Sequence, residues 1–162
     1  MSGTQWEIDY PDCSMSELVL AVAERYPSNA AYSFLGEETT YREFARKIRE
    51  CARALVQAGI KSGERVTICL PNTPQAVILF YAINAIGATA HMLHPLCAPE
   101  ELLFYIEAGR SVAAFTLDRF LPKFLPAIEA ELLKAVYVTD IGDGMRFVKK
   151  TLYRAATRLT GK

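Results

Sequence analysis

Charged residues are missing from a long central stretch of this sequence. Residues 66–99 contain no Asp, Glu, Lys or Arg. A membrane-spanning helix needs about 20 apolar residues in an unbroken run, and here Pro71, Pro74 and Gly87 interrupt the stretch. The pattern therefore favours a buried strand–helix–strand unit over a membrane span.

The sequence also lacks the glycine patterns that hold phosphate groups. None of its nine glycines lies in G-x-x-x-x-G-K or G-x-G-x-x-G, whose backbone amides surround phosphates. The segment Gly59-Ile-Lys-Ser62 resembles the end of the first pattern, but it follows a predicted helix and precedes a predicted strand, which is the reverse of the required order. No Ser lies in G-x-S-x-G. We therefore predict no catalytic residue and no bound cofactor for this chain.

The four cysteines are dispersed, and no C-x-x-C pair occurs. This spacing argues against a zinc site and against a disulfide framework. Cys51 and Cys69 lie within apolar patterns, where a free cysteine acts as a small core residue. Met1 is followed by polar residues instead of a signal segment. We expect a reduced, cytoplasmic protein.

The charges balance overall but are unevenly distributed. Eighteen basic residues match 18 acidic ones, so nothing indicates a nucleic-acid partner. After Asp143 there are six basic residues and no acidic one, and apolar residues there recur at helical spacing. We predict one α/β unit over residues 1–141 and a basic amphipathic helical arm over 142–162. The helix of residues 145–162 would either contact a membrane surface or pack on the rest of a larger protein.

From residue 41 onward, the predicted helices and strands alternate. This order is typical of an α/β fold with a mainly parallel sheet, right-handed crossovers and helices on both faces. An N-terminal helix and a β-hairpin are predicted before it. The expected helices cover residues 14–26, 41–58, 74–86 and 99–109, with one or two turns after Asp118 that Pro122 and Pro126 break. The expected strands cover 30–35, 39–41, 65–70, 88–93, 111–116 and 134–139.

Two polar residues follow predicted strands of the sheet. Ligands of open α/β sheets bind beyond the carboxyl ends of the strands, so we predict that Asn72 and His94 belong to a substrate pocket. Two simpler interpretations stay open: Asn72 caps the next helix, and His94 ends a strand together with His91 without binding anything. The spacing of the two histidines places them on opposite faces of a strand, and we predict no metal site.

Four segments, in order and at sensible intervals, resemble the opening of the AMP-binding, adenylate-forming family. Glu64 and Phe44 replace the Asp and Leu that are commoner there. The resemblance covers about residues 14–140 and implies the N-terminal portion of an acyl-CoA synthetase, similar to a long-chain fatty-acid–CoA ligase. The four segments are Thr40-Tyr-Arg-Glu-Phe44, Ala52-Arg-Ala-Leu-Val-Gln-Ala-Gly59, Gly63-Glu-Arg-Val-Thr-Ile-Cys-Leu-Pro-Asn72 and Ala85-Ile-Gly-Ala-Thr-Ala-His-Met-Leu-His-Pro95.

In that family a carboxylic acid attacks the α-phosphate of ATP, and coenzyme A or another thiol captures the acyl-adenylate. The family uses a Ser/Thr/Gly-rich loop ending in Lys and a mobile C-terminal domain with a catalytic Lys, neither of which is matched here. The resemblance therefore implies a first subdomain on the acyl-pocket side that is inactive alone. ATP, Mg²⁺ and coenzyme A would serve the full-length enzyme, with the remainder of the ligase chain as partner.

Exposed apolar surface would also lead this piece to self-associate. The alternative is a stand-alone α/β binding or assembly module derived from the same family.

Overall fold

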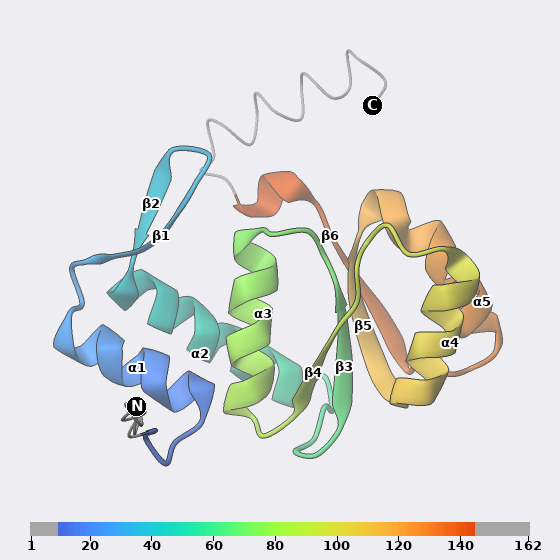
Figure 1. Ribbon diagram of the computed structural model, residues 1–162, viewed down its shortest axis with the longest axis horizontal. Helices are drawn as coiled ribbons and strands as arrows, with labels where there is room; N and C mark the ends of the chain where they lie inside the picture. Colours follow the sequence, from blue (N-terminus) through green and yellow to red (C-terminus); the bar gives the residue numbers. More distant parts are fainter. Residues whose placement is uncertain (1–9, 145–162) are drawn as a thin grey trace, which may run out of the picture.

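A strand buried on both faces lies at the centre of the fold. The computed structural model describes residues 10–144, and strand β3 (Arg65–Cys69) pairs in parallel with β4 on one side and β5 on the other. Val66, Thr67, Ile68 and Cys69 are all 0% exposed, as expected for a parallel strand covered on both faces. The sheet order is β4-β3-β5-β6, and a separate hairpin pairs β1 with β2 antiparallel (Figure 1).

The element order confirms the predicted α/β fold, its mainly parallel sheet and its N-terminal hairpin. The helices are α1 (Met15–Arg25), α2 (Tyr41–Gln57), α3 (Pro74–Ala85), α4 (Pro99–Gly109) and α5 (Leu125–Glu129). The remaining strands are β1 (Ala30–Phe34), β2 (Glu37–Thr40), β4 (Thr89–Met92), β5 (Ser111–Leu117) and β6 (Ala135–Thr139), and two 3-10 helices follow β5 and β6, η1 (Asp118–Phe124) and η2 (Ile141–Gly144). Most of the predicted arm lies outside the described residues.

One helix boundary differs from the sequence prediction. The predicted start of α3 at Pro74 is confirmed, with Thr73 as its N-cap, although the Thr73 side chain makes no capping hydrogen bond. Pro126 does not break a helix; it lies in the first turn of α5, where proline is tolerated because its missing N–H would have no partner in the helix. Other predicted boundaries are confirmed: Ser14 forms a complete capping box, and Gly59 ends the turn after α2 with φ +84°, which favours glycine.

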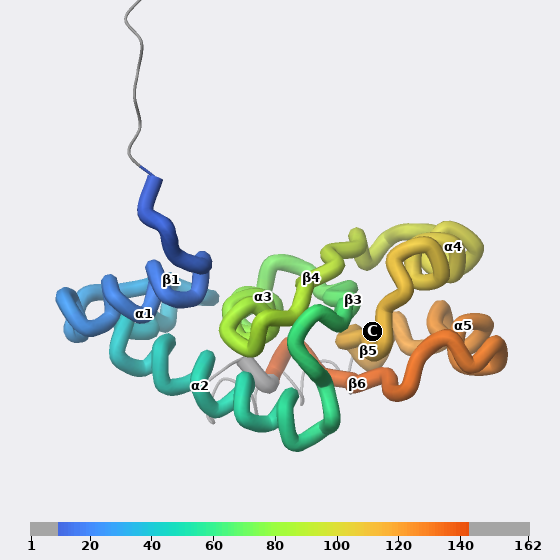
Figure 2. Tube along the Cα trace, turned by 90° about the horizontal axis from the view of Figure 1, so that it is seen from below, coloured from blue at the N-terminus to red at the C-terminus, as the bar shows by residue number. Residues whose placement is uncertain are grey.

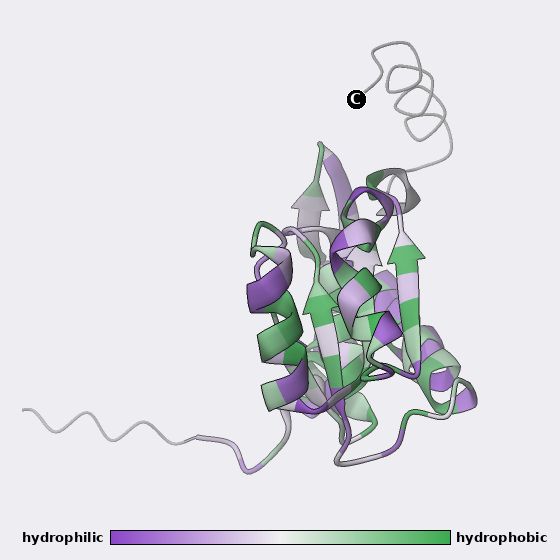
Figure 3. Ribbon diagram, turned by 90° about the vertical axis from the view of Figure 1, so that its right-hand side faces the viewer, coloured by the Kyte–Doolittle hydropathy of each residue, from purple (hydrophilic) through white to green (hydrophobic). Residues whose placement is uncertain are grey.

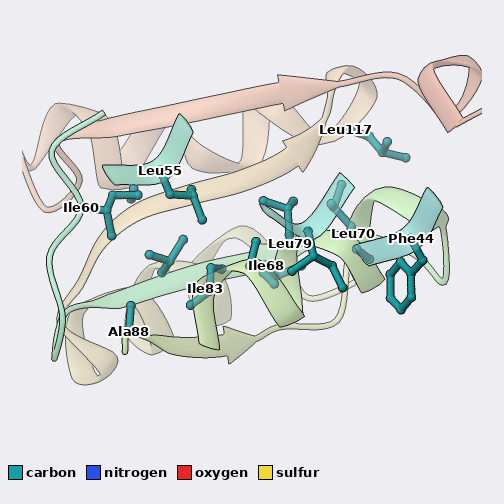
Figure 4. Packing of buried hydrophobic residues seen from close by; sticks show 14 residues of the cluster. Phe44, Leu55, Ile60, Ile68, Leu70, Leu79, Ile83, Ala88 and Leu117 are labelled. Carbon is teal, nitrogen blue, oxygen red and sulfur yellow. The ribbon is translucent and has the colours of Figure 1, made fainter. Parts of the chain in front are cut away.

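Two apolar layers cover the two faces of the sheet. The larger joins α2 and α3 to the sheet, and its members Leu55, Ile68, Leu79 and Ile83 gather between these helices and β3 (Figure 4). The smaller lies between the sheet and the pair α4 and α5, around Leu102. Figure 2 shows α2 and α4 on opposite sides of the sheet. Helices therefore cover both faces of the sheet, as predicted.

The apolar centre and polar exterior follow from the sequence pattern. Figure 3 shows hydrophobic strands between helices whose surfaces mix hydrophobic and hydrophilic residues. Burial raises the pKa of the Cys51 and Cys69 thiols to about 11, so both stay protonated near neutral pH. Among residues 10–144 we find no helix that could span a lipid bilayer.

The end of α4 approaches β4 so closely that a Cβ at Gly109 would displace the His91 ring. A Cβ on Gly109 would lie 2.5 Å from Cε1 and 2.7 Å from Nδ1 of His91. The Gly109 carbonyl accepts a hydrogen bond from Arg65 Nη1 at 3.1 Å, and His91 Nδ1 lies 3.1 Å from Ser111 Oγ. The missing side chain thus lets α4 settle against a polar cluster on the sheet.

Replacing Gly109 by Ala sets two opposing effects against each other. Inside a helix, alanine is favoured over glycine by about 1 kcal/mol. Here, however, the added Cβ would push His91 away from Ser111, and overpacking costs about 1–3 kcal/mol. We predict that Gly109→Ala lowers the free energy of unfolding by about 1 kcal/mol, as measured by urea denaturation. In a His91→Ala background the same change should be neutral or stabilising, and stabilisation in the wild-type background would contradict this account.

Candidate functional site

A cleft of about 640 Å³ lies at the carboxyl edge of the sheet. The central strand β3 is flanked by β4 on one side and β5 on the other, so the chain switches sides of β3 at this edge. Open α/β sheets bind ligands at such a switch point. The cleft is lined from all four strand ends by Leu70, Pro71, Asn72, Met92, Leu93, His94, Pro95, Leu96, Leu117, Arg119, Phe120 and Ile141.

Both predicted site residues, Asn72 and His94, line this cleft. The alternative that Asn72 caps the next helix is wrong, because Thr73 is the N-cap of α3. A role of these two residues in binding a substrate stays a prediction. The structure shows that they reach one cleft from neighbouring strands, as the rule about carboxyl ends implies.

The ring of His94 is oriented by its own loop. Its Nδ1 accepts a hydrogen bond from the Leu96 N–H at 3.2 Å. In a neutral imidazole one nitrogen accepts and the other donates, so this bond assigns the proton to Nε2. His94 therefore offers the cleft a hydrogen-bond donor, and Asn72 adds a side-chain amide that can donate or accept.

A lysine fixes the loop that carries His94. The Lys123 ammonium donates to the carbonyl oxygens of Pro95 and Cys97 at 3.0 and 2.9 Å. It also lies 5.2 Å from the centre of the Phe120 ring, within the range of a cation–π interaction. Lys123 in η1 thus links the segment after β5 to the loop after β4, and both segments line the cleft.

Sequence reasoning missed Arg119, Phe120 and Lys123. The signal that selected Asn72 and His94, namely a position just after a buried strand, also applies to Arg119 and Phe120. They follow β5, and both line the cleft. Lys123 could not have been found in this way, because its partners are backbone carbonyls about 26 to 28 positions earlier in the chain.

The other histidine lies away from the cleft, in a polar cluster under α4. Thr67 donates to Ser111 Oγ at 2.8 Å, and Ser111 Oγ lies 3.1 Å from His91 Nδ1. A serine beside a histidine could form a nucleophile and base, but Ser111 is only 2% exposed. Burial, and secondarily the charge of Arg65, lowers the pKa of His91. This cluster joins α4 to the sheet, and no group of potential metal ligands occurs among the described residues.

Comparison with known proteins identifies one matching family and several named relatives. A family model described as AMP-binding enzyme matches residues 19–157. A long-chain-fatty-acid–CoA ligase of Bacillus subtilis is 27% identical over 147 residues, which cover 91% of this chain and 26% of that protein. Another from Salmonella typhimurium is 28% identical over 140 residues, covering 86% and 25%. The chain therefore spans about a quarter of the length of the curated relatives it matches.

Solved structures of low identity share the fold. A long-chain-fatty-acid-CoA ligase from Archaeoglobus fulgidus superposes with a TM-score of 0.75 at 22% identity, covering 82% of this chain and 28% of that one. The inhibitor-bound N-terminal domain of FACL13 from Mycobacterium tuberculosis gives a TM-score of 0.72 at 23% identity, covering 79% and 34%. These likenesses confirm that the fold is the one predicted from the sequence.

The lowered pKa of His91 predicts how this residue changes stability with pH. The unfolded chain binds a proton at His91 near the ordinary histidine pKa of about 6.5, whereas the folded chain resists protonation. His91 should therefore contribute stability above about pH 6.5 that is lost as the pH falls through the folded pKa. Urea denaturation between about pH 8 and 5 should show this loss in wild type and in His94→Asn, and less of it in His91→Asn. An equal loss in His91→Asn would contradict the assignment.

Replacing Lys123 by Met should free the loop after β4. Met keeps the length and apolar stem but cannot donate to Pro95 and Cys97. We predict a loss of about 1–2 kcal/mol in the free energy of unfolding and faster amide exchange at Leu96 and Cys97. Lys134, whose exposed ammonium pairs with Glu64, provides the control: Lys134→Met should cost less than about 1 kcal/mol. Equal effects of the two changes would contradict the role given to Lys123.

Proposed function

Because the chain belongs to the AMP-binding enzyme family, we propose that it is the N-terminal part of an ATP-dependent acyl-CoA synthetase. The reaction would activate a long-chain carboxylic acid as its acyl-adenylate and transfer the acyl group to coenzyme A. The relatives from Bacillus subtilis and Salmonella typhimurium support this proposal by their names as long-chain-fatty-acid–CoA ligases. The activity is proposed for the whole enzyme, and this chain would supply one side of its acyl-binding site.

The cleft at the carboxyl edge carries the proposal. Its walls are mostly apolar, with Met92, Leu96 and Phe120 among them, and few polar side chains interrupt them. Its volume of about 640 Å³ lies within the usual range of small-molecule sites, about 300–1,000 Å³. An apolar wall of this kind suits an alkyl chain, because each buried methylene contributes about 0.8 kcal/mol.

The described residues show no preformed metal-binding group. Residues 10–144 contain no group of three or more His, Cys, Asp or Glu side chains that could hold a metal ion. The sequence also offers no glycine-rich turn to surround phosphates. We therefore propose that other parts of the enzyme hold ATP, Mg²⁺ and coenzyme A, and that this chain does not catalyse adenylation alone.

Exposed apolar side chains on α4 and α5, called here the outer face of these helices, support the proposal that a partner covers them. Phe104 is 62% exposed, Leu125 48% and Ile128 40%, which leaves large apolar side chains in water. We propose that the remainder of the ligase covers this face in the whole enzyme, and that the isolated chain self-associates through it.

Two measurements test the proposed function. In an ATP–pyrophosphate exchange assay with palmitate, the chain alone should give only the background rate, and exchange above background would contradict the proposed division of labour. In equilibrium binding, the chain should take up a fluorescent long-chain fatty acid without ATP. Leu96→Asp, a change at a 71% exposed cleft residue, should weaken that binding at least about tenfold because it places a charge against the alkyl chain.

The matched control for Leu96→Asp is Leu125→Asp. Leu125 is also exposed, but it is the first residue of α5 and does not line the cleft. The Leu125→Asp variant should bind the fatty acid as wild type does. An equal loss of binding in the two variants would count against the cleft as the acyl site.

A further inference from the structure

One positive side chain lines this mostly apolar cleft without a counter-ion in the described part of the chain. Arg119 lines the cleft, and its guanidinium carbon lies 5.3 Å from the centre of the Phe120 ring. No carboxylate oxygen of residues 10–144 lies within ion-pair distance of Arg119, since the ion pairs there involve other residues. A guanidinium held against an aromatic ring keeps its outer N–H donors available for a carboxylate or phosphate.

The start of α3 adds positive potential to the same edge. Asn72 lines the cleft immediately before the N-cap Thr73. Thr73 makes no side-chain capping bond, and its Oγ1 is buried without a hydrogen-bond partner among the described residues. The first N–H groups of an uncapped helix attract anions, and α3 is 12 residues long. Helix and arginine therefore favour the same sign of ligand charge.

Two neighbouring carboxylates reduce this potential but do not pair with Arg119. The Asp118 carboxylate accepts the Arg119 backbone N–H at 2.7 Å, the Asp140 carboxylate accepts the Gly142 N–H at 2.5 Å, and the ion pairs among residues 10–144 do not include Arg119. Lys123 is a second cation behind Phe120, but two backbone carbonyls occupy its ammonium. Arg119 is thus the side chain in this cluster that can pair with a ligand.

We infer that the cleft binds an amphipathic anion, with the anionic head on Arg119 and the alkyl part along Leu96 and Phe120. The head would be a carboxylate or a phosphate ester, because a guanidinium can donate two parallel hydrogen bonds to either group. This inference rests on the proposed function, which already places a long-chain carboxylic acid in the cleft, and deepens it. It adds a specificity residue: Arg119 selects charged over neutral alkyl ligands.

The test compares ligands that share an alkyl chain and differ in the head group. Isothermal titration of the full 162-residue chain would use decanoate, decyl phosphate and decanol, each below its critical micelle concentration, and inorganic phosphate alone. Arg119 is exposed, so wild type should bind an anionic ligand about two- to fivefold more tightly than decanol, as one exposed ion pair implies. Added salt should reduce this preference. The relative affinities of decanoate and decyl phosphate identify the head group, and tighter binding of inorganic phosphate than of either would overturn the amphipathic ligand.

Arg119→Gln should remove the preference for anions while leaving decanol binding unchanged. The matched control is Arg42→Gln, since Arg42 is exposed in α2, away from the cleft, and this variant should keep the preference. Equal binding of decanol and the anions in wild type, or an unchanged preference in Arg119→Gln, would overturn the role of Arg119 and leave the apolar cleft as an acyl site. Failure of all alkyl ligands to bind would overturn both this inference and the proposed function.

Discussion

Complete burial of the last four residues of β3, Val66 to Cys69, is the constraint from which the rest of the structure follows. A stretch of strand without exposed residues must be covered on both faces and paired on both edges, and helices and neighbouring strands supply that cover. Because β4 pairs with one edge and β5 with the other, the chain has to change sides at the carboxyl end of β3. That change of side separates the loops, and the separation produces the cleft. Fold and candidate site therefore have one physical origin.

The cleft is held in shape by polar contacts that lie outside its apolar walls. Lys123 joins two loops through backbone carbonyls, and His94 is oriented by a backbone N–H. At the opposite, amino-terminal part of the sheet, the contact of Gly109 with His91 anchors α4. Such contacts leave few polar groups free to face a ligand. The polar side chains that line the cleft are those of Asn72, His94 and Arg119.

Periodicity and turn residues were enough to predict the fold and part of the site. The alternation of apolar strands with capped helices predicted the sheet, and the strand-end rule found Asn72 and His94. The same rule also holds at the end of β5, where it points to Arg119. Ser111 could not have been placed from the sequence, because the pairing of β3 with β5 shifts register between Arg65 and Val66, and a bulge changes which face a residue occupies. Contacts between distant residues, such as those of Lys123, leave no local pattern.

Family membership and fold agree with the proposal that this chain contributes the acyl side of a ligase active site. The most direct test of that claim is to map bound palmitate on the backbone amide NMR spectrum of the chain. The account predicts that the amides of Asn72, His94, Leu96 and Phe120 shift as the fatty acid is added, while those of α1 and the β1–β2 hairpin do not. Shifts confined to the outer face of α4 and α5, or an unchanged spectrum at saturating palmitate, would contradict it.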